Sequence, residues 1–272
     1  MAVDAANGAA YQTTPTVLAK LGADVELCAA APDGFNINVD CGSTCPGTLS
    51  KLVQKSGAAF GVAHDGDADR LVLCDENGTP LDGDELLAIA SVDLIRRDQL
   101  KQNTVVATVM SNFGLDDLLR EHSGTVLRTP VGDRFVVDAL VQHGLNLGGE
   151  QSGHIIFRDF ATTGDGLISA LQLIAVILQT GKPLSELRRI LRRYPQLLRN
   201  VTVREKKPFE QVGSIPAILR EAETRLSGRG RIVLRYSGTE PKARLLLEGP
   251  DADEIEMLAD AIMEELVRNI GK

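Results

Sequence analysis

Short apolar runs alternate with helix-like segments from the start of the chain. Strands that alternate with helices are typical of βαβ units, so this order predicts an α/β domain. We predict strands at residues 2–7, 23–31, 58–63 and 71–75, and helices at residues 14–21, 48–56 and 85–97. A turn at residues 76–78 reverses the chain, and Asp84 is placed to cap the helix that follows.

The same order of elements returns after residue 104, which predicts a second α/β domain. We predict strands at residues 105–110 and 125–130, and helices at residues 115–121, 134–143 and 167–178. Asp165 precedes the last of these helices, and Gly181 followed by Pro183 ends it. Residues 183–193 then predict an amphipathic helix with a solvated face of four arginines.

The pattern changes to a small α+β arrangement after Leu197. We predict strands at residues 199–204, 230–236 and 243–249, and helices at residues 215–226 and 252–270. The fold class is therefore α/β, with two α/β domains and a smaller C-terminal α+β domain. The expected domains are residues 1–98, 99–196 and 197–272.

Charge and composition limit the function classes. The 29 basic and 37 acidic residues give a net charge of -8, which argues against a nucleic-acid or anionic-membrane surface over the whole molecule. The longest apolar run, residues 167–178, falls short of the roughly 20 residues that span a bilayer, so we expect no membrane segment. No signal peptide opens the chain, and we expect a cytoplasmic protein. Cys41 and Cys45 lack the partners of a zinc site.

The sharpest motif is the acidic loop Asp65-Gly66-Asp67-Ala68-Asp69-Arg70 between two apolar strands. Carboxylates at alternate positions of a tight loop can converge on one hard cation. The alternatives are an acidic turn or a calcium loop of the EF-hand type. The EF-hand requires glycine where Arg70 stands, and its flanks are helical. Mg²⁺ with a phosphate ligand therefore fits better.

Two further loops carry polar groups suited to a phosphorylated sugar. In Gly148–His154, the side chains of Glu150, Ser152 and His154 would share one face of an extended strand. Asp133 and Arg134 lie nearby in sequence and offer charged contacts, although Asp133 is equally suited to cap a helix. A polar glycine-rich hairpin would look similar.

The third loop follows a predicted strand and has the composition of an anion site. Its members are Arg235, Tyr236, Ser237, Gly238, Thr239, Glu240 and Pro241, with Lys242 and Arg244 beyond. Hydroxyls, converging N–H groups and guanidinium groups together bind phosphate well. An ordinary Ser/Gly/Pro turn is the alternative.

Taken together, DGDADR, GGEQSGH and RYSGTEP, in this order, resemble the metal, sugar and phosphate loops of the α-D-phosphohexomutase superfamily. The segments VDAANGAA, GFNINVDCGST, ATVMSNFGL and TPVGDR extend the resemblance over nearly the whole chain. EQSGH and SGTEP are similar to the phosphoglucosamine mutase branch, while phosphomannomutases and phosphoglucomutases more often have EMSGH and SNTEP. Tyr236 departs from this branch, in which a basic residue is common at that position.

The resemblance implies two α/β domains with mixed sheets, the second and third of the family's four, followed by the smaller fourth domain. It implies an isomerase that converts glucosamine 6-phosphate to glucosamine 1-phosphate through a bisphosphorylated intermediate and a phosphoserine. That serine lies in a Thr-Arg-x-Ser-Gly-like loop of the family's first domain, and the resemblance here covers only the second, third and fourth domains. We therefore expect a shortened form that is inactive alone. A glucose or mannose phosphate substrate, or a non-catalytic phosphosugar-binding module, stays open as an alternative.

The resemblance also assigns roles to residues. It implies Mg²⁺ bound by Asp65, Asp67 and Asp69, with Arg70 as a nearby cation and His154 as an assisting group. It implies phosphosugar contacts from Asp133, Arg134, Glu150, Ser152, His154, Arg235, Ser237, Gly238, Thr239 and Arg244. We expect no nucleic-acid partner, and a homo-oligomer stays open because an exposed sheet edge can pair with another chain.

Overall fold

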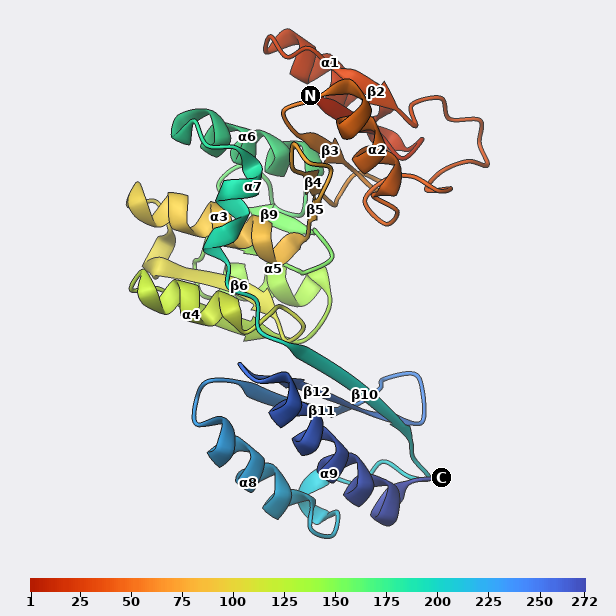
Figure 1. The fold of residues 1–272 in the computed structure, drawn as a ribbon, viewed down its shortest axis with the longest axis vertical. Coiled ribbons are helices and arrows are strands. Elements are labelled where there is room, and N and C mark those ends of the chain that lie inside the picture. Colours follow the sequence, from red (N-terminus) through yellow and green to blue (C-terminus); the bar gives the residue numbers. More distant parts are fainter. The chain divides into compact units, whose positions relative to one another are not determined.

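The computed structural model describes residues 1–272. The chain forms two compact units, and three residues from the middle of the sequence belong to the later one. The first unit contains residues 1–111 and 115–192, and the second contains residues 112–114 and 193–272. Figure 1 shows both units along the chain. The α/β class with mixed sheets is confirmed, while the domain boundaries at residues 98 and 196 stay predictions.

The first unit contains two mixed sheets. The first sheet has the order β2-β1-β3-β4-β5, in which β1 pairs in parallel with β2 and β3, and β4 pairs antiparallel with β3 and β5. Its elements are β1 (Ala2–Asp4), η1 (Ala9–Tyr11), α1 (Thr13–Lys20), β2 (Glu26–Cys28), α2 (Gly47–Ser56), β3 (Gly61–Ala63), β4 (Val72–Cys74), β5 (Pro80–Leu81) and α3 (Gly83–Arg96). The parallel strands end at the same edge, which is where β3 delivers the acidic loop.

The second sheet repeats this plan with the order β7-β6-β8-β9 and one antiparallel edge strand, β9. Its elements are η2 (Lys101–Asn103), β6 (Thr104–Thr108), α4 (Gly114–Glu121), β7 (Thr125–Thr129), α5 (Asp133–Gln142), β8 (Leu147–Gly149), β9 (Ile155–Phe157), α6 (Gly166–Thr180), α7 (Leu184–Leu187) and η3 (Arg188–Ile190). The repeat of βα units that the pattern predicts is therefore present.

One hydrophobic core joins the two sheets. It includes Val3 and Leu73 from the first sheet, Leu87 from α3, Leu147 from the second sheet and Leu173 from α6, all of them buried. Helices α3 and α6 pack against each other within it, as Figure 1 shows. Burial of this apolar surface stabilises the unit by roughly 25 cal/mol per Å² and holds the loops of both sheets in one frame.

Two local predictions are wrong. The N-cap of α3 is Asp82, whose carboxylate accepts from the N–H groups of Asp84 and Glu85, and Glu85 completes a capping box. The cap therefore lies two residues before Asp84, because Asp82 has the extended backbone that a cap needs. The stretch 183–193 is not one amphipathic helix, since α7 and η3 end at Ile190.

Arg188 does not belong to a solvated face either. Its guanidinium donates to the carboxylate of Glu85 at 2.8 Å and to that of Asp75 at 3.3 Å. These carboxylates are almost fully buried, so the arginine offsets their desolvation. No single helix combines the length and apolar composition that crossing a bilayer needs, and α6 with residues 184–190 meets both only as a pair bent by 95°.

The second unit is a three-stranded antiparallel sheet, in the order β10-β12-β11, with helices on one face. Its elements are β10 (Gln196–Thr202), η4 (Phe209–Gln211), α8 (Ile215–Leu226), β11 (Arg231–Tyr236), β12 (Lys242–Glu248) and α9 (Ala252–Ile270). Leu245, Leu247, Ile262 and Leu266 form its buried core between the sheet and the helices. The predicted α+β arrangement is therefore correct.

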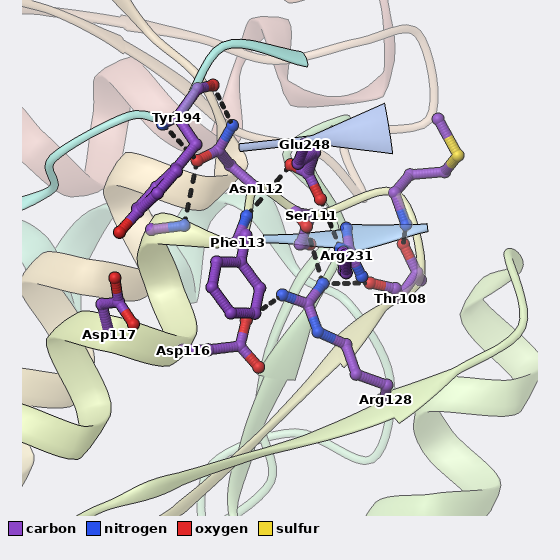
Figure 2. A network of polar contacts seen from close by, with 12 residues as sticks. Thr108, Ser111, Asn112, Phe113, Asp116, Asp117, Arg128, Tyr194, Arg231 and Glu248 are labelled. Carbon is purple, nitrogen blue, oxygen red and sulfur yellow. Dashed lines mark hydrogen bonds and ion pairs between the residues drawn. The ribbon is translucent and has the colours of Figure 1, made fainter. Parts of the chain in front are cut away.

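Residues 112–114 are held in the second unit by polar contacts (Figure 2). The side chain of Asn112 accepts from the N–H groups of Gly114 and Tyr194 and donates to the carbonyl of Tyr194, each at 3.0 Å. The fully buried carboxylate of Glu248 accepts from the N–H of Phe113 at 3.0 Å and pairs with Arg231. Burial of this carboxylate is tolerated because each oxygen has a donor.

Within the first unit, Arg128 holds the end of β6 in a similar way (Figure 2). It donates to the carbonyls of Thr108 and Ser111 at 2.7 and 2.6 Å and forms an ion pair with Asp116. These bonds provide donors for backbone carbonyl groups at the end of β6 and in the loop that follows it.

Candidate functional site

The acidic loop leaves β3 and turns sharply at Ala68. Ala68 has a φ of 64°, and its N–H donates to the carbonyl of Asp65 at 3.1 Å. The carbonyl of Ala68 accepts from the N–H of Gly166 at 2.9 Å, at the start of α6. A non-glycine residue in the left-handed region is uncommon and needs such support from its surroundings.

This turn brings the three aspartates together. Oxygen atoms of Asp65, Asp67 and Asp69 all lie within 4.8 Å of one another. Asp65 is buried, Asp69 is half-buried and Asp67 is exposed, so the cluster opens toward solvent on one side. Oxygen donors in this number, with open positions left over, suit a small hard cation.

Two observations at Asp69 support a charged ligand there. Its Oδ1 atom is buried and makes no hydrogen bond. Burial raises the pKa of the Asp69 carboxyl above its usual value, His154 lowers it, and the negative charges of Asp65 and Asp67 raise it further. A cation would relieve this repulsion, so the donor set fits a divalent metal ion.

Arg70 neutralises part of the cluster. Its backbone N–H donates to Oδ1 of Asp65 at 3.1 Å, and its Nε lies 3.4 Å from Oδ2 of the same residue. Its Nε also lies 3.8 Å from Oδ1 of Asp69. Arg70 thus contacts two of the three carboxylates and leaves its outer guanidinium nitrogens available.

His154 from the second sheet reaches the acidic loop of the first. Its Nδ1 lies 3.2 Å from Oδ2 of Asp69, and Arg70 and His154 form an antiparallel bridge. The neighbouring N–H of Leu71 donates to the carbonyl of Gly153 at 2.9 Å. The acidic loop and the loop at residues 148–154, which are 85 residues apart in the sequence at Asp69 and His154, therefore meet within the first unit.

The His154 ring lies so close to the backbone that only glycine fits beside it. A Cβ atom at Gly164 would lie 2.4 Å from ring atoms of His154. His154 is 3% exposed, and its Nε2 makes no hydrogen bond. The imidazole is thus fixed in position, with its Nε2 atom unpaired.

His64 is a supporting residue that the sequence did not indicate. It is fully buried behind the acidic loop, with Nδ1 3.1 Å from the carbonyl oxygen of Arg70 and Nε2 3.0 Å from the hydroxyl of Thr14. Burial lowers its pKa, although the carbonyl of Arg70 and nearby carboxylates oppose this. The only sequence signal was its place directly before Asp65.

The loop at residues 148–154 forms a tight hairpin turn between β8 and β9, which is the alternative that the sequence left open, so Glu150, Ser152 and His154 do not share one face of an extended strand. Strand β8 ends at Gly149, and the N–H of Glu150 donates to the carbonyl of His154 at 3.0 Å. The turn forms because Gly153 adopts a φ of 95°, which favours glycine. Ser152 is exposed at the tip and His154 is buried at the base.

Glu150 links this turn to the start of α5. Its Oε1 accepts from the N–H of Gly132 at 2.9 Å. Gly132 is the N-cap of α5, so Asp133 is the first helical residue and does not cap the helix. Asp133 and Arg134 are exposed, and Arg134 lies 3.6 Å from Asp138.

The third loop lies in the second unit, between β11 and β12. The N–H of Ser237 donates to the carbonyl of Lys242 at 2.8 Å, and its hydroxyl accepts from the N–H of Glu240 at 3.3 Å. Ser237 is buried, whereas Gly238 and Thr239 are exposed at the tip. The loop thus presents its small residues outward from a fixed base.

Basic side chains surround this loop. Arg235 and Arg244 are directly opposite each other in the β11–β12 register, so their side chains share one face. Glu240 pairs with Lys242 at 2.5 Å and Arg244 at 2.7 Å, and hydrogen bonds from these two lower its pKa. The guanidinium group of Arg235 makes no hydrogen bond or ion pair, which leaves a cation free for an anionic ligand.

Tyr236 points to the other face. Its ring stacks on Phe209 with centroids 4.2 Å apart and planes at 15°, and its hydroxyl donates to the carbonyl of Lys207 at 2.7 Å. The side chain that departs from the family pattern therefore serves packing.

The sequence profiles that match this chain all describe domains of one protein family. Three sequence profiles of phosphoglucomutase/phosphomannomutase match in order, namely alpha/beta/alpha domain II at residues 1–78, alpha/beta/alpha domain III at residues 82–194 and the C-terminal domain at residues 198–265. Curated phosphoglucosamine mutases from Pelobacter propionicus and Myxococcus xanthus are 49% and 50% identical over 99% of this chain. The chain covers 60% and 59% of these relatives.

Solved structures agree on the fold. A phosphoglucomutase/phosphomannomutase family protein from Burkholderia thailandensis matches with a TM-score of 0.77 at 21% identity, over 100% of this chain and 62% of its own. N-acetylphosphoglucosamine mutase from Aspergillus fumigatus, in complex with GlcNAc-6P and magnesium, matches with a TM-score of 0.74 at 20% identity, over 97% of this chain and 60% of its own.

Proposed function

Because the chain belongs to the phosphoglucomutase/phosphomannomutase family, we propose that it supplies the metal, sugar and phosphate sites of a phosphoglucosamine mutase. Such an enzyme interconverts glucosamine 6-phosphate and glucosamine 1-phosphate. The main support is the convergence of three aspartates with His154 and Arg70 in the first unit. Relatives named phosphoglucosamine mutase at about half identity favour this substrate over glucose or mannose phosphates.

The acidic loop would hold Mg²⁺ through Asp65, Asp67 and Asp69. The bound ion would neutralise charge on a phosphoryl group in transfer. Around it, Arg70 adds a fixed positive charge beside two of these carboxylates. His154 keeps its ring against Asp69 and can hold or move a proton at Nε2.

The turn at residues 150–153, which we call the sugar turn, would bind hydroxyl groups of the substrate. Glu150 keeps one carboxylate oxygen for a ligand while the other is held by the N–H of Gly132. Ser152 offers a hydroxyl at the exposed tip, and Asp133 and Arg134 add charged groups at the neighbouring helix start. Polar groups of this kind can accept a sugar in either of two orientations.

The loop of the second unit would hold the phosphate that does not react. Ser237, Gly238 and Thr239 offer N–H and hydroxyl groups, and Arg235 and Arg244 offer guanidinium groups on one face. Binding a remote phosphate in this way positions the other end of the sugar for reaction.

The phosphoryl-carrying serine of the family's first domain is not among these residues, because the three matched profiles are domains II and III and the C-terminal domain. One Thr-Arg-x-Ser-Gly sequence occurs, at residues 224–228, but it lies in the C-terminal domain, where it ends α8 and Ser227 donates its hydroxyl to the carbonyl of Thr224 at 2.6 Å. Purified residues 1–272 should therefore show no glucosamine phosphate mutase activity in a coupled assay. Activity should return when the family's first domain is supplied in the same chain. Turnover above a trace rate by residues 1–272 alone would contradict this assignment, and a non-catalytic binding module would show none in either form.

Binding separates the roles of two loops. We expect Arg235→Ala to weaken glucosamine 6-phosphate binding by about tenfold, the loss of one charge-assisted phosphate contact, and Asp67→Ala to weaken it less. Titration calorimetry in Mg²⁺ buffer measures both. Stronger weakening by Asp67→Ala would count against the assignment, and tighter binding of glucose or mannose 6-phosphate would change the proposed substrate.

A further inference from the structure

A segment before α8 runs beside the phosphate loop of the second unit. The N–H of Val203 donates to the carbonyl of Pro241 at 2.8 Å, and Val203 also forms a bridge with Gly271. The N–H of Arg204 donates to the carbonyl of Ile270 at 2.9 Å. The start of the segment, which we define as residues 203–209, is thus tied to the loop and to the end of α9.

The far end of segment 203–209 is tied to the loop as well. Phe209 stacks on the ring of Tyr236, and the hydroxyl of Tyr236 donates to the carbonyl of Lys207. Stacked aromatic pairs of this kind contribute roughly 0.5–1.5 kcal/mol beyond the area they bury. Because Tyr236 directly precedes Ser237, anchors on both sides hold Lys206 next to the phosphate loop.

Lys206 makes one contact in this position. Its Nζ donates to the backbone carbonyl of Ser237 at 2.5 Å, and the side chain has no carboxylate partner. An ammonium group has three donors, so two remain for a ligand. The neighbouring Lys207 differs, because its ammonium pairs with Glu205 at 2.6 Å.

We propose that Lys206 is a further phosphate-binding residue, which donates to the phosphate monoester held by residues 237–240. Lys242 and Arg244 are both paired with Glu240, so Lys206 and Arg235 are the cations that a phosphate recruits without breaking an ion pair. Lys206 approaches from the segment, and Arg235 from β11. This inference rests on the proposed role of the loop in binding phosphosugar.

The test is titration calorimetry of the 272-residue chain with glucosamine 6-phosphate and, separately, with inorganic phosphate. We expect Lys206→Met to weaken binding of both about tenfold, because a charge-assisted hydrogen bond is lost. Lys206→Arg should retain most of the affinity, since it keeps the charge. Lys207→Met is the matched control and should bind like the unsubstituted chain.

The outcomes separate this inference from the proposed function. If Arg235→Ala weakens binding while Lys206→Met does not, Lys206 is not a phosphate ligand and the loop assignment stands. Equal weakening by Lys206→Met and Lys207→Met would indicate general electrostatics and overturn the inference. If the unsubstituted chain binds neither probe, the proposed function fails and the inference fails with it. Circular dichroism measures whether each variant is folded. We expect all of them to fold, because the side chains of Lys206 and Lys207 are exposed.

Discussion

Asp69 makes contacts with more of the candidate site residues of the first unit than its neighbours in the acidic loop do. It contributes to the carboxylate cluster, contacts His154 across the two sheets and lies within reach of Arg70. Its raised pKa follows from burial beside two other acids. A single side chain thus connects the expected metal site to the sugar turn, and its neighbours decide how strongly it holds a proton.

His64 makes this region sensitive to acid. Burial lowers its pKa, so below about pH 6.5 the unfolded chain binds a proton that the folded chain does not. The free energy of unfolding should therefore fall as the pH is lowered from about 7 to about 5, by at most ~1.4 kcal/mol per pH unit. Urea unfolding at each pH measures this slope.

His64→Gln should flatten the slope, because the titrating group is removed. His143→Gln is the control, since His143 is exposed, and it should leave the slope unchanged. An identical acid sensitivity in His64→Gln and the unsubstituted chain would show that other groups are responsible.

At the scale of elements, the start of α3 positions the sugar turn because the two backbones lie very close together. The first residue of α3, Gly83, donates its N–H to the carbonyl of Gln151 at 3.0 Å. A Cβ atom there would lie 2.0 Å from the carbonyl oxygen of Glu150. The sugar turn between β8 and β9 is thus packed directly onto the start of a helix from the preceding sheet, and glycine is what permits it.

Gly83→Ala should force the sugar turn and α3 apart. We expect a loss of about 1–3 kcal/mol in the free energy of unfolding and weaker sugar-phosphate binding. The atoms that the added Cβ would meet all belong to the backbone and cannot move aside as the end of a flexible side chain could. Gly47→Ala is the matched control, since Gly47 is the first residue of α2 and a Cβ atom there has nothing within 4 Å. Equal stability of the two variants would contradict this account.

At the scale of the whole molecule, the expected sites are divided between the two units. The acidic loop and the sugar turn belong to the first, and the phosphate loop belongs to the second. Residues 112–114 are part of the second unit although the chain on both sides belongs to the first. The chain therefore passes from one unit to the other after residues 111, 114 and 192. Hydrogen bonds of the Asn112 and Glu248 side chains hold residues 112–114 in place.

Asn112→Ala should loosen the second unit. Three hydrogen bonds of the side chain are lost, for an expected loss of about 1–3 kcal/mol. Hydrogen exchange read by mass spectrometry should show faster exchange in residues 193–196. Asn200→Ala provides the control, because Asn200 is exposed on β10. Unchanged exchange in Asn112→Ala would show that this segment does not depend on the side chain.

The sequence by itself determined the order and type of most elements, because apolar periodicity and capping residues act locally. Helices α1, α2, α4, α8 and α9 lie where the pattern predicts them, within one residue at each end. Predictions from the local pattern were wrong where a contact with a residue far away in the sequence determines the conformation. Asp82 replaces Asp84 as a cap, Arg188 joins two buried carboxylates instead of solvent, and Glu150 lies in a turn instead of a strand.

The three candidate loops were also readable from the sequence, since their residue types and spacing are local properties. Only the tertiary structure decided that His154 meets Asp69, that His64 stands behind the acidic loop, and that Lys206 lies at the carbonyl of Ser237. Each of these contacts joins residues far apart in the chain. Such pairs arise when packed cores bring strand ends and turns together, which no local pattern of hydrophobic and polar positions specifies.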